Sequence, residues 1–322
     1  MSEIEVTNWS EGDLPRLVRF WNRSFSDRRN FFPITETLFR TRVLEKKTAV
    51  EAFDPTTFLL VREGEEIIGV LHGGVRVEEL CRTLHSTWPG GEQAYIALYH
   101  VREENRNQGV GSALWRRFYE VAGEGRQLVV DGQCINPFYG NSEGPFTPFW
   151  GTPEGISVLW ADSGTKKFLA RKGFAPRFKA VQMELDVRHA EYEGSVPSGF
   201  DLKIVDDYYP DLGVTYGVAQ RYDNGGEFTC AVVLSHGKTV AVLSWFPLKE
   251  IEPSRYAIYE AMVMDEYQGK GLGRALVAAA IDWFRKKKAS TCDVLTIPEI
   301  SRPAFELYSR AGFTPCDNWA IY

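Results

Sequence analysis

Residues 256–274 read YAIYEAMVMDEYQGKGLGR, and this stretch decides the fold. The apolar run that includes Ile258 and Val263 predicts a buried strand, and the glycines that follow it mark a turn. Beyond the turn, apolar side chains recur at helical spacing, at Leu276, Val277, Ala280, Ile281 and Phe284. Residues 256–284 therefore predict a strand, a glycine loop and a helix that begins at the loop.

The same pattern occurs earlier in the chain. Residues 94–112 read AYIALYHVREENRNQGVGS, and this loop also runs into a helical pattern. A strand, a turn and a strand precede each stretch, over residues 57–75 and 228–246. A further apolar strand and a Gly-Phe pair close each copy, at Gly173-Phe174 and Gly312-Phe313. Strands that alternate with helices in this order predict two tandem α/β domains, each a mixed sheet flanked by helices.

The length of the chain supports two domains, because 322 residues exceed one ordinary domain. Residues 189–199 contain the Gly, Ser and Pro typical of a linker. We therefore predict an N-terminal domain over residues 1–190 and a C-terminal domain over residues 191–322. Residues 134–155, rich in Gly, Pro, Phe and Trp, predict an ordered aromatic loop inserted in the first copy.

Composition excludes several classes of partner. A net charge of −6 gives no basic field for nucleic acid. No apolar stretch approaches the roughly 20 residues that span a bilayer, and the N-terminus has no apolar signal region. Five scattered cysteines without a CxxC pair, and five histidines without ligand spacing, predict a cytoplasmic protein with neither a disulfide framework nor a metal.

The glycine loops predict a phosphate site. Gly-x-Gly at a strand-to-helix junction lets the backbone approach a ligand, and the helix N-terminus offers unpaired N–H groups. Neither loop contains a Walker A motif or the third glycine of the GxGxxG dinucleotide fingerprint. Asp293 follows the second loop at about the distance of a ribose-binding acid, but a hairpin precedes the loop. A nicotinamide-dependent oxidoreductase is therefore the weakest interpretation.

Taken together, these residues resemble the GCN5-related N-acetyltransferase (GNAT) superfamily. Gln268 to Gly273 matches the family's [QR]-x-x-G-x-[GA] loop, and Leu307 to Phe313 matches its Leu-Tyr-x-x-x-Gly-Phe element. Residues 106–111 and 168–174 repeat both elements in the first half. The resemblance implies acetyl-CoA as the acyl donor, lying between two parting strands of each mixed sheet, and an amine as the acceptor.

The resemblance also implies which residues hold acetyl-CoA. The loop amides would bind its pyrophosphate, and the strand before each loop would pair with its pantetheine arm. The family often has an Asn before its Tyr; here that position is Ser301, or Asp162 in the first half. In the second half the implied contacts are Ala261, Met262, Val263, Gln268, Gly269, Lys270, Gly271, Leu272, Gly273, Arg274 and Ser301. In the first half they are Tyr99, His100, Val101, Arg106, Asn107, Gln108, Gly109, Val110, Gly111 and Ser112.

Acetyl transfer to an amine needs a base for the amine and a proton for the leaving thiolate. By the resemblance, Tyr308 is the general acid, since a phenol has a pKa of about 10, close to that of a thiol. Glu260, an acid in an apolar strand, is the expected base because burial raises a carboxyl pKa, and Glu299 is the alternative. The first half has Leu98 and Leu169 in the places of Glu260 and Tyr308, so we expect that copy to be degenerate.

The sequence therefore predicts an acetyl-CoA-dependent N-acetyltransferase that works from its C-terminal domain on a primary amine, in a small molecule or a peptide. The alternative is a non-catalytic acyl-CoA-binding regulatory module, which the two leucines favour only in the first half. We expect a monomer or a homodimer.

Overall fold

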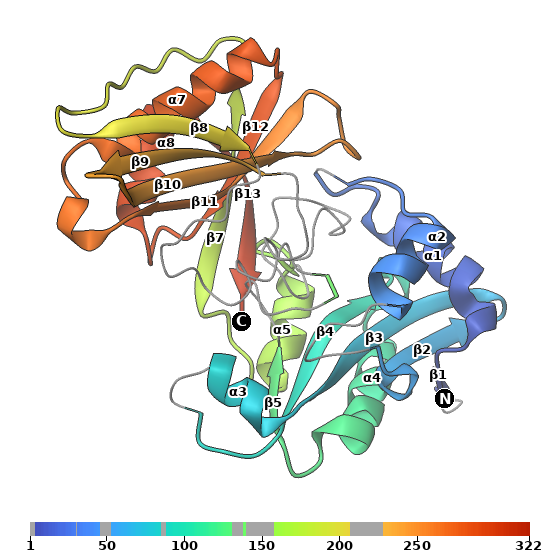
Figure 1. Cartoon of the computed structure of the whole chain (residues 1–322). Helices are drawn as coiled ribbons and strands as arrows, with labels where there is room; N and C mark the ends of the chain where they lie inside the picture. The colour runs from blue at the N-terminus through green and yellow to red at the C-terminus, as the bar shows by residue number, and fades with distance from the viewer. Residues whose placement is uncertain are drawn as a thin grey trace. The chain divides into compact units, whose positions relative to one another are not determined.

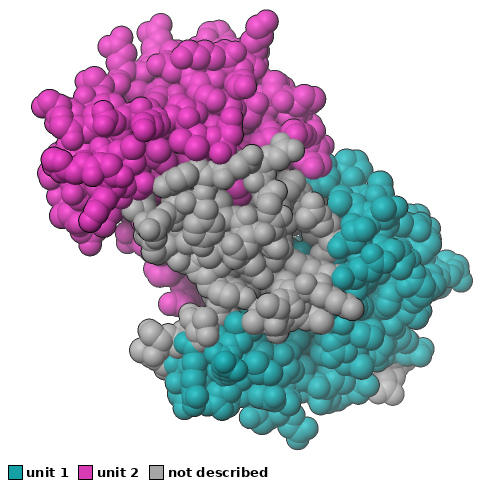
Figure 2. All heavy atoms as spheres, in the orientation of Figure 1, with its two compact units in different colours: residues 1–150, 154–156 teal, residues 151–153, 157–322 magenta. Residues whose placement is uncertain are grey.

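The computed structural model describes residues 4–29, 31–45, 53–84, 88–130, 138–139, 158–206 and 228–322. The chain forms two compact units (Figure 2). Unit 1 contains residues 1–150 and 154–156, and unit 2 contains residues 151–153 and 157–322. Each unit has its own sheet flanked by helices (Figure 1), which confirms the predicted α/β class. Of the predicted insertion at 134–155, only Phe138 and Tyr139 belong to the described residues.

Unit 1 contains five strands in the order β1-β2-β3-β4-β5. All neighbours are antiparallel except β4 and β5, which are parallel. The strands are β1 (Val6–Asn8), β2 (Phe58–Glu63), β3 (Glu66–Arg76), β4 (Gln93–Val101) and β5 (Gln127–Val130). The helices are α1 (Leu14–Phe25), α2 (Glu36–Phe39), α3 (Glu78–Leu84) and α4 (Val110–Phe118), with short turns η1 (Glu11–Asp13), η2 (Arg40–Leu44), η3 (Pro55–Thr57), η4 (Glu103–Asn105) and η5 (Tyr119–Gly123). The helix that follows the glycine loop, α4, packs against β2 and β3.

Unit 2 contains eight strands in the order β6-β13-β7-β12-β11-β10-β9-β8. They are β6 (Val158–Leu159), β7 (Phe178–Asp186), β8 (Asp201–Asp206), β9 (Thr229–Ser235), β10 (Lys238–Pro247), β11 (Arg255–Val263), β12 (Thr291–Thr296) and β13 (Thr314–Ile321). The helices are α5 (Ser163–Arg171), η7 (Asp265–Tyr267), α7 (Leu272–Lys286) and α8 (Arg302–Arg310). The core lies between the sheet and α7, whose apolar face packs against β9, β10 and β11.

Because of strand β7, the compact units do not have the same boundaries as the two sequence copies. The repeat places β7 at the end of the first copy, but it lies between β12 and β13, antiparallel to both (Figure 1). Met183, for example, stands opposite Val294 on one side and Pro315 on the other. The compact units therefore divide near residue 157, whereas the repeat divides near residue 190.

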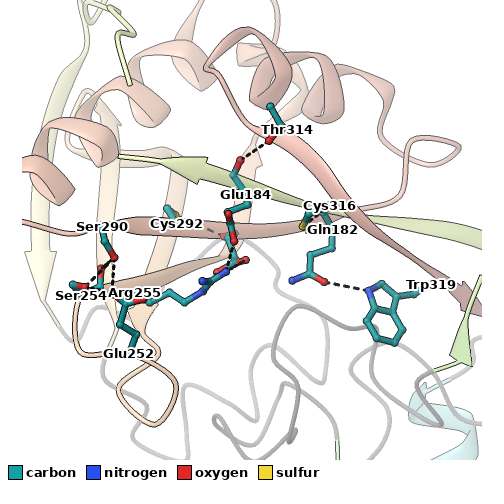
Figure 3. A network of polar contacts seen from close by, with 11 residues as sticks. Gln182, Glu184, Glu252, Ser254, Arg255, Ser290, Cys292, Thr314, Cys316 and Trp319 are labelled. Atoms are coloured by element: carbon teal, nitrogen blue, oxygen red, sulfur yellow. Dashed lines mark hydrogen bonds and ion pairs between the residues drawn. The ribbon is translucent and has the colours of Figure 1, made fainter. Parts of the chain in front are cut away.

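Ion pairs connect β7 to the centre of the sheet (Figure 3). Arg255 on β11 donates to Asp293 on β12 at 2.6 Å and to Glu184 on β7 at 2.5 Å. Burial alone would lower the pKa of Arg255, but the hydrogen bonds and charges of the two carboxylates outweigh it and raise that pKa. The Asp293 side chain is fully buried, so loss of its partner would leave an uncompensated charge in the interior.

Other sequence predictions concern the cysteines and the membrane. The four cysteines within the described residues, Cys81, Cys230, Cys292 and Cys316, are free thiols. None of the helices in the described ranges has both the length and the hydropathy to cross a bilayer. Within the same ranges, no three His, Cys, Asp or Glu side chains group as metal ligands would.

Candidate active site

Two parallel strands of unit 2 part in the middle of the sheet. β11 and β12 pair up to Ile258 and Val294, and no later pair joins them within the described residues. β11 then continues to Val263 beside β10 only. The backbone of residues 259–263 therefore keeps donors and acceptors without a strand partner on the β12 side, which an extended ligand can use. This stretch includes the predicted contacts Ala261, Met262 and Val263.

A β-bulge lies where the strands part. Ser244 on β10 stands opposite Glu260, but the next residue, Trp245, stands opposite Ile258, so Tyr259 is the extra residue. A bulge re-aims the side chains beside it. Trp245 packs on α7, with its ring 5.4 Å from that of Phe284. Because side chains alternate along β10, Ser244 faces away from α7, and its cross-strand partner Glu260 shares that face.

Glu260 has the environment expected of a general base. Its Oε2 atom is buried and has no hydrogen-bond partner among the described residues. Burial raises the pKa of Glu260 to about 7, because the surrounding medium disfavours the charged form. A carboxyl group with this pKa can accept and release a proton near neutral pH. Glu299, the alternative base, lies exposed in the turn before α8.

Six consecutive backbone N–H groups are unpaired at the start of α7. Within the described residues, no N–H from Gly269 to Arg274 donates a hydrogen bond, and the first to do so is that of Ala275, to Gly271 at 3.1 Å. Gly269 and Gly271 have φ of 73° and 84°, values that side chains rarely tolerate. No atom lies within 4 Å of a Cβ built on either glycine, so the space beside the loop is open. This geometry suits an anion such as a pyrophosphate.

Two side chains of the loop form hydrogen bonds within the protein that stabilise the loop. Gln268 donates from Nε2 to the carbonyl of Val263 at 3.2 Å and to Asp265 at 2.8 Å. Arg274 donates from Nε to the carbonyl of Glu193 at 2.7 Å, in the segment between β7 and β8. The features of this loop that suit an anion are therefore its backbone amides.

Tyr308 lies on the other face of the same sheet. It is 3% exposed within the core formed with α7, and its ring packs on Phe313 with the centroids 5.5 Å apart. Burial raises the pKa of Tyr308, and the nearby Cys292 adds to the rise. The phenol is therefore protonated at neutral pH, as a proton donor must be.

The positions matched to the family's Asn differ between the copies. Ser301 precedes α8 and makes no side-chain capping bond, so its hydroxyl is not committed to the helix. Asp162 caps α5 by accepting from the backbone N–H of Thr165 at 2.9 Å. The acid at position 162 thus has a structural role as a helix cap.

Unit 1 repeats parts of the backbone of this site. Among the described residues, β4 and β5 pair up to Ile96 and Val130, where the description of β5 ends, and β4 continues to Val101. The bulge also recurs, since β3 pairs His72 with Leu98 but Gly73 with Ile96. The predicted contacts Tyr99, His100 and Val101 follow this bulge and pair with β3.

The loop of unit 1 has the same six unpaired amides. No N–H from Asn107 to Ser112 donates a hydrogen bond within the described residues, and Ala113 donates to Gly109 at 2.9 Å. Asn107 takes the place of Gly269 with a φ of 61°. Arg106 donates from Nε to the carbonyl of Val101 at 3.2 Å, as Gln268 does to Val263.

The side chains beside the bulge of unit 1 are different. Leu98 stands where unit 2 has Glu260, and His72 stands where it has Ser244. His72 is fully buried, with Nδ1 2.8 Å from the Tyr139 hydroxyl and its ring stacked on Phe58 at 4.7 Å. Burial lowers the pKa of His72 to about 3, so the imidazole is neutral.

Sequence reasoning missed Ser244 and His72. Each is a polar residue within an apolar strand, in VAVLSWF over residues 240–246 and in VLHGGV over residues 70–75. That contrast was a usable signal. Their importance depends on which residue stands opposite, and only the observed register with its bulge shows that.

Comparisons with known proteins agree with this geometry. A model of the acetyltransferase (GNAT) family matches residues 15–130 and 200–313. A solved tandem GNAT protein from the clavulanic acid biosynthesis pathway aligns with 99% of this chain and 97% of its own, at 16% identity and a TM-score of 0.64. A GCN5-related N-acetyltransferase from Sphaerobacter thermophilus aligns with 99% and 95%, at 13% identity and a TM-score of 0.63. No curated protein matches the chain.

The two family matches include the two glycine loops and the strand before each of them, β4 and β11. Neither match includes β7. The structural likenesses, at these low identities, show the fold alone. The chain belongs to the GNAT acetyltransferase family and carries two copies of its domain in tandem.

Proposed function

We propose that this protein is an acetyl-CoA-dependent N-acetyltransferase and that its chemistry takes place in unit 2, on a primary amine. One observation carries the proposal. Unit 2 contains the glycine loop, whose backbone amides suit an anion, and the two strands that part. It also contains a buried carboxyl group, that of Glu260, and a buried phenol, that of Tyr308. The first sequence copy keeps the glycine loop, in unit 1, but has leucines at both matched positions, Leu98 and Leu169.

The residues that would hold the acyl donor belong to the backbone. Amides from Gly269 to Arg274 would bind the pyrophosphate, and residues 261–263 would pair with the pantetheine arm. The hydroxyl of Ser301 would add a side-chain contact. The thioester bound there supplies the activated acetyl group.

The side chains would move the protons. Glu260 would take one proton from the acceptor's ammonium group, which leaves a nitrogen lone pair to attack the thioester carbon. As the C–N bond forms and the C–S bond breaks, Tyr308 would protonate the departing sulfur. The second proton that the nitrogen releases would restore the phenol. The net products are an amide, a free thiol and one proton.

Unit 1 supports a second function, binding of an acyl-CoA without turnover. Its six unpaired amides match those of unit 2, so its backbone suits the same ligand. The first sequence copy has leucines instead of the carboxyl and phenol groups at the matched positions, with Leu98 in unit 1 and Leu169 in α5 of unit 2. The sites Tyr99 to Val101 and Arg106 to Ser112 would therefore serve binding.

A thiol-release assay tests the catalytic proposal. Purified protein is given acetyl-CoA, or longer acyl-CoAs, with a panel of primary amines, and free thiol is measured. Release that depends on one class of amine supports the transferase. Binding of acetyl-CoA by calorimetry without release on any amine would favour the non-catalytic module, and stabilisation by NAD alone would contradict both.

A further inference from the structure

Two residues paired across β10 and β11 each have a buried polar atom without a hydrogen-bond partner among the described residues. The Oγ atom of Ser244 and the Oε2 atom of Glu260 are both buried, and neither has a hydrogen-bond partner among the described residues. Ser244 is 0% exposed. Buried polar atoms in folded proteins are nearly always hydrogen-bonded, so an adjacent pair without partners requires an explanation.

The register places these two atoms near one another. Ser244 and Glu260 are direct cross-strand partners on the face opposite α7, and such partners have Cβ atoms about 5 Å apart. The residue beside Glu260 in the chain, Tyr259, packs its ring 5.3 Å from that of Phe228 and 6.0 Å from that of Phe246.

The matched pair in unit 1 has one such polar atom where unit 2 has two. His72 stands in the place of Ser244; its Nδ1 lies at hydrogen-bond distance from Tyr139, and its Nε2 is buried without a hydrogen-bond partner among the described residues. Its partner across the strands, Leu98, is apolar. The combination of a hydroxyl and a carboxyl group therefore occurs only in the unit that also carries Tyr308.

We propose that Ser244 and Glu260 form a two-point site for the acceptor's amino group and restrict the acceptor to primary amines. This rests on the function proposed above. After Glu260 has taken one proton, the nitrogen keeps two N–H groups and a lone pair. One N–H is donated to the Glu260 carboxyl group and the other to Ser244 Oγ, which leaves the lone pair for the thioester carbon.

The site distinguishes acceptors by the number of N–H groups that the attacking nitrogen can donate. A secondary amine has only one N–H once deprotonated, so it leaves one of the two buried oxygens unpaired. An alcohol likewise has a single O–H. Leaving a buried hydrogen-bonding group unpaired is costly, so both analogues should be poor acceptors.

The test measures thiol release with benzylamine, N-methylbenzylamine and benzyl alcohol, and with the same three forms of any better amine from the panel. The protein should strongly prefer the primary amine. Ser244→Ala should raise KM for the primary amine about 10-fold, the scale of one lost hydrogen bond, and reduce its preference over the N-methyl form by a similar factor. The KM for acetyl-CoA should not change.

Ser235→Ala is the matched control, because Ser235 is also a buried strand serine (8% exposed) but lies at the far end of β9. It should leave both KM values and the preference as they are. An unchanged primary-to-secondary preference in Ser244→Ala would overturn the inference, even if the variant is less stable. Absence of transfer to every amine, with acetyl-CoA still bound, would instead overturn the proposed function.

Discussion

In unit 1 the cross-strand pair beside the bulge is His72 and Leu98, and in unit 2 it is Ser244 and Glu260. Around these pairs two features of the backbone recur: a bulge beside the pair, and a loop in which six successive N–H groups donate no hydrogen bond within the described residues. The comparison separates two requirements of one fold. Binding of an acyl donor depends on main-chain geometry, which substitutions of the neighbouring side chains leave intact. Proton transfer depends on a few side chains, and single substitutions remove it.

The largest expected effect concerns where each unit ends. A fragment of residues 191–322 lacks β7, so β12 and β13 lose their shared partner and Arg255 loses Glu184. We expect this fragment to be unfolded or aggregated. A fragment that begins at residue 157 keeps β7 and should melt cooperatively. Circular dichroism melts of both fragments check this, and a stably folded 191–322 would show that β7 is dispensable.

The next effect concerns the proton donor. Tyr308→Phe should lower kcat by roughly 10²–10³-fold, the usual contribution of a positioned general acid. Acetyl-CoA affinity should change little, because the loss is confined to one hydroxyl. Leu169→Met is the control at the matched position of the first copy and should leave kcat unchanged. Full activity in Tyr308→Phe would place proton transfer elsewhere.

A smaller effect should follow a change in the loop. Gly271→Glu puts a negative charge and a side chain at a left-handed position beside the unpaired amides, and we expect about 100-fold weaker acetyl-CoA binding. Gly269→Asn is the matched control, because unit 1 has Asn107 there at a similar φ. Calorimetric titration of both variants checks this. Equal affinity in Gly271→Glu would show that this loop does not hold the donor.

The smallest effect is on stability. The pKa of Glu260 is about 7 when folded, against an ordinary value of 4.5, so the fold favours the protonated carboxyl. The penalty for ionising it is absent below pH 4.5 and complete above pH 7. Glu260→Gln should therefore stabilise the protein by about 3 kcal/mol at pH 8 and by less than about 1 kcal/mol at pH 5. Urea unfolding at both pH values measures this, and a difference independent of pH would mean that Glu260 is not buried.

The sequence predicted those parts of the fold that depend on local pattern. The strand, loop and helix over residues 256–284 follow from apolar periodicity and glycine position, and the structure has β11 and α7 there. Tyr308 and Glu260 were found because one lies in a family motif and the other is a charge in an apolar strand. Their catalytic roles stay predictions.

The sequence could not predict which strands pair when they lie far apart in the chain. Nothing local to residues 178–186 shows that their partners are residues 291–296 and 314–321. The repeat pointed instead to the first copy, because each copy ends with a similar helix and Gly-Phe pair. Ser244 was missed for a related reason: a bulge shifts the register by one residue, and no pattern in β10 or β11 alone records it.

The place of β7 also has a consequence for synthesis of the chain. Its two neighbours are made later than it is, and about 105 residues separate the end of β7 at Asp186 from the start of β12 at Thr291. At about 5–20 residues per second, the ribosome needs on the order of 5–20 s to reach β12. During that interval β7, in which apolar and polar residues are mixed, lacks both of its strand partners, and unpaired strand edges can pair with another molecule. Codon usage between positions 187 and 291, which sets the length of this interval, should therefore influence the yield of folded protein.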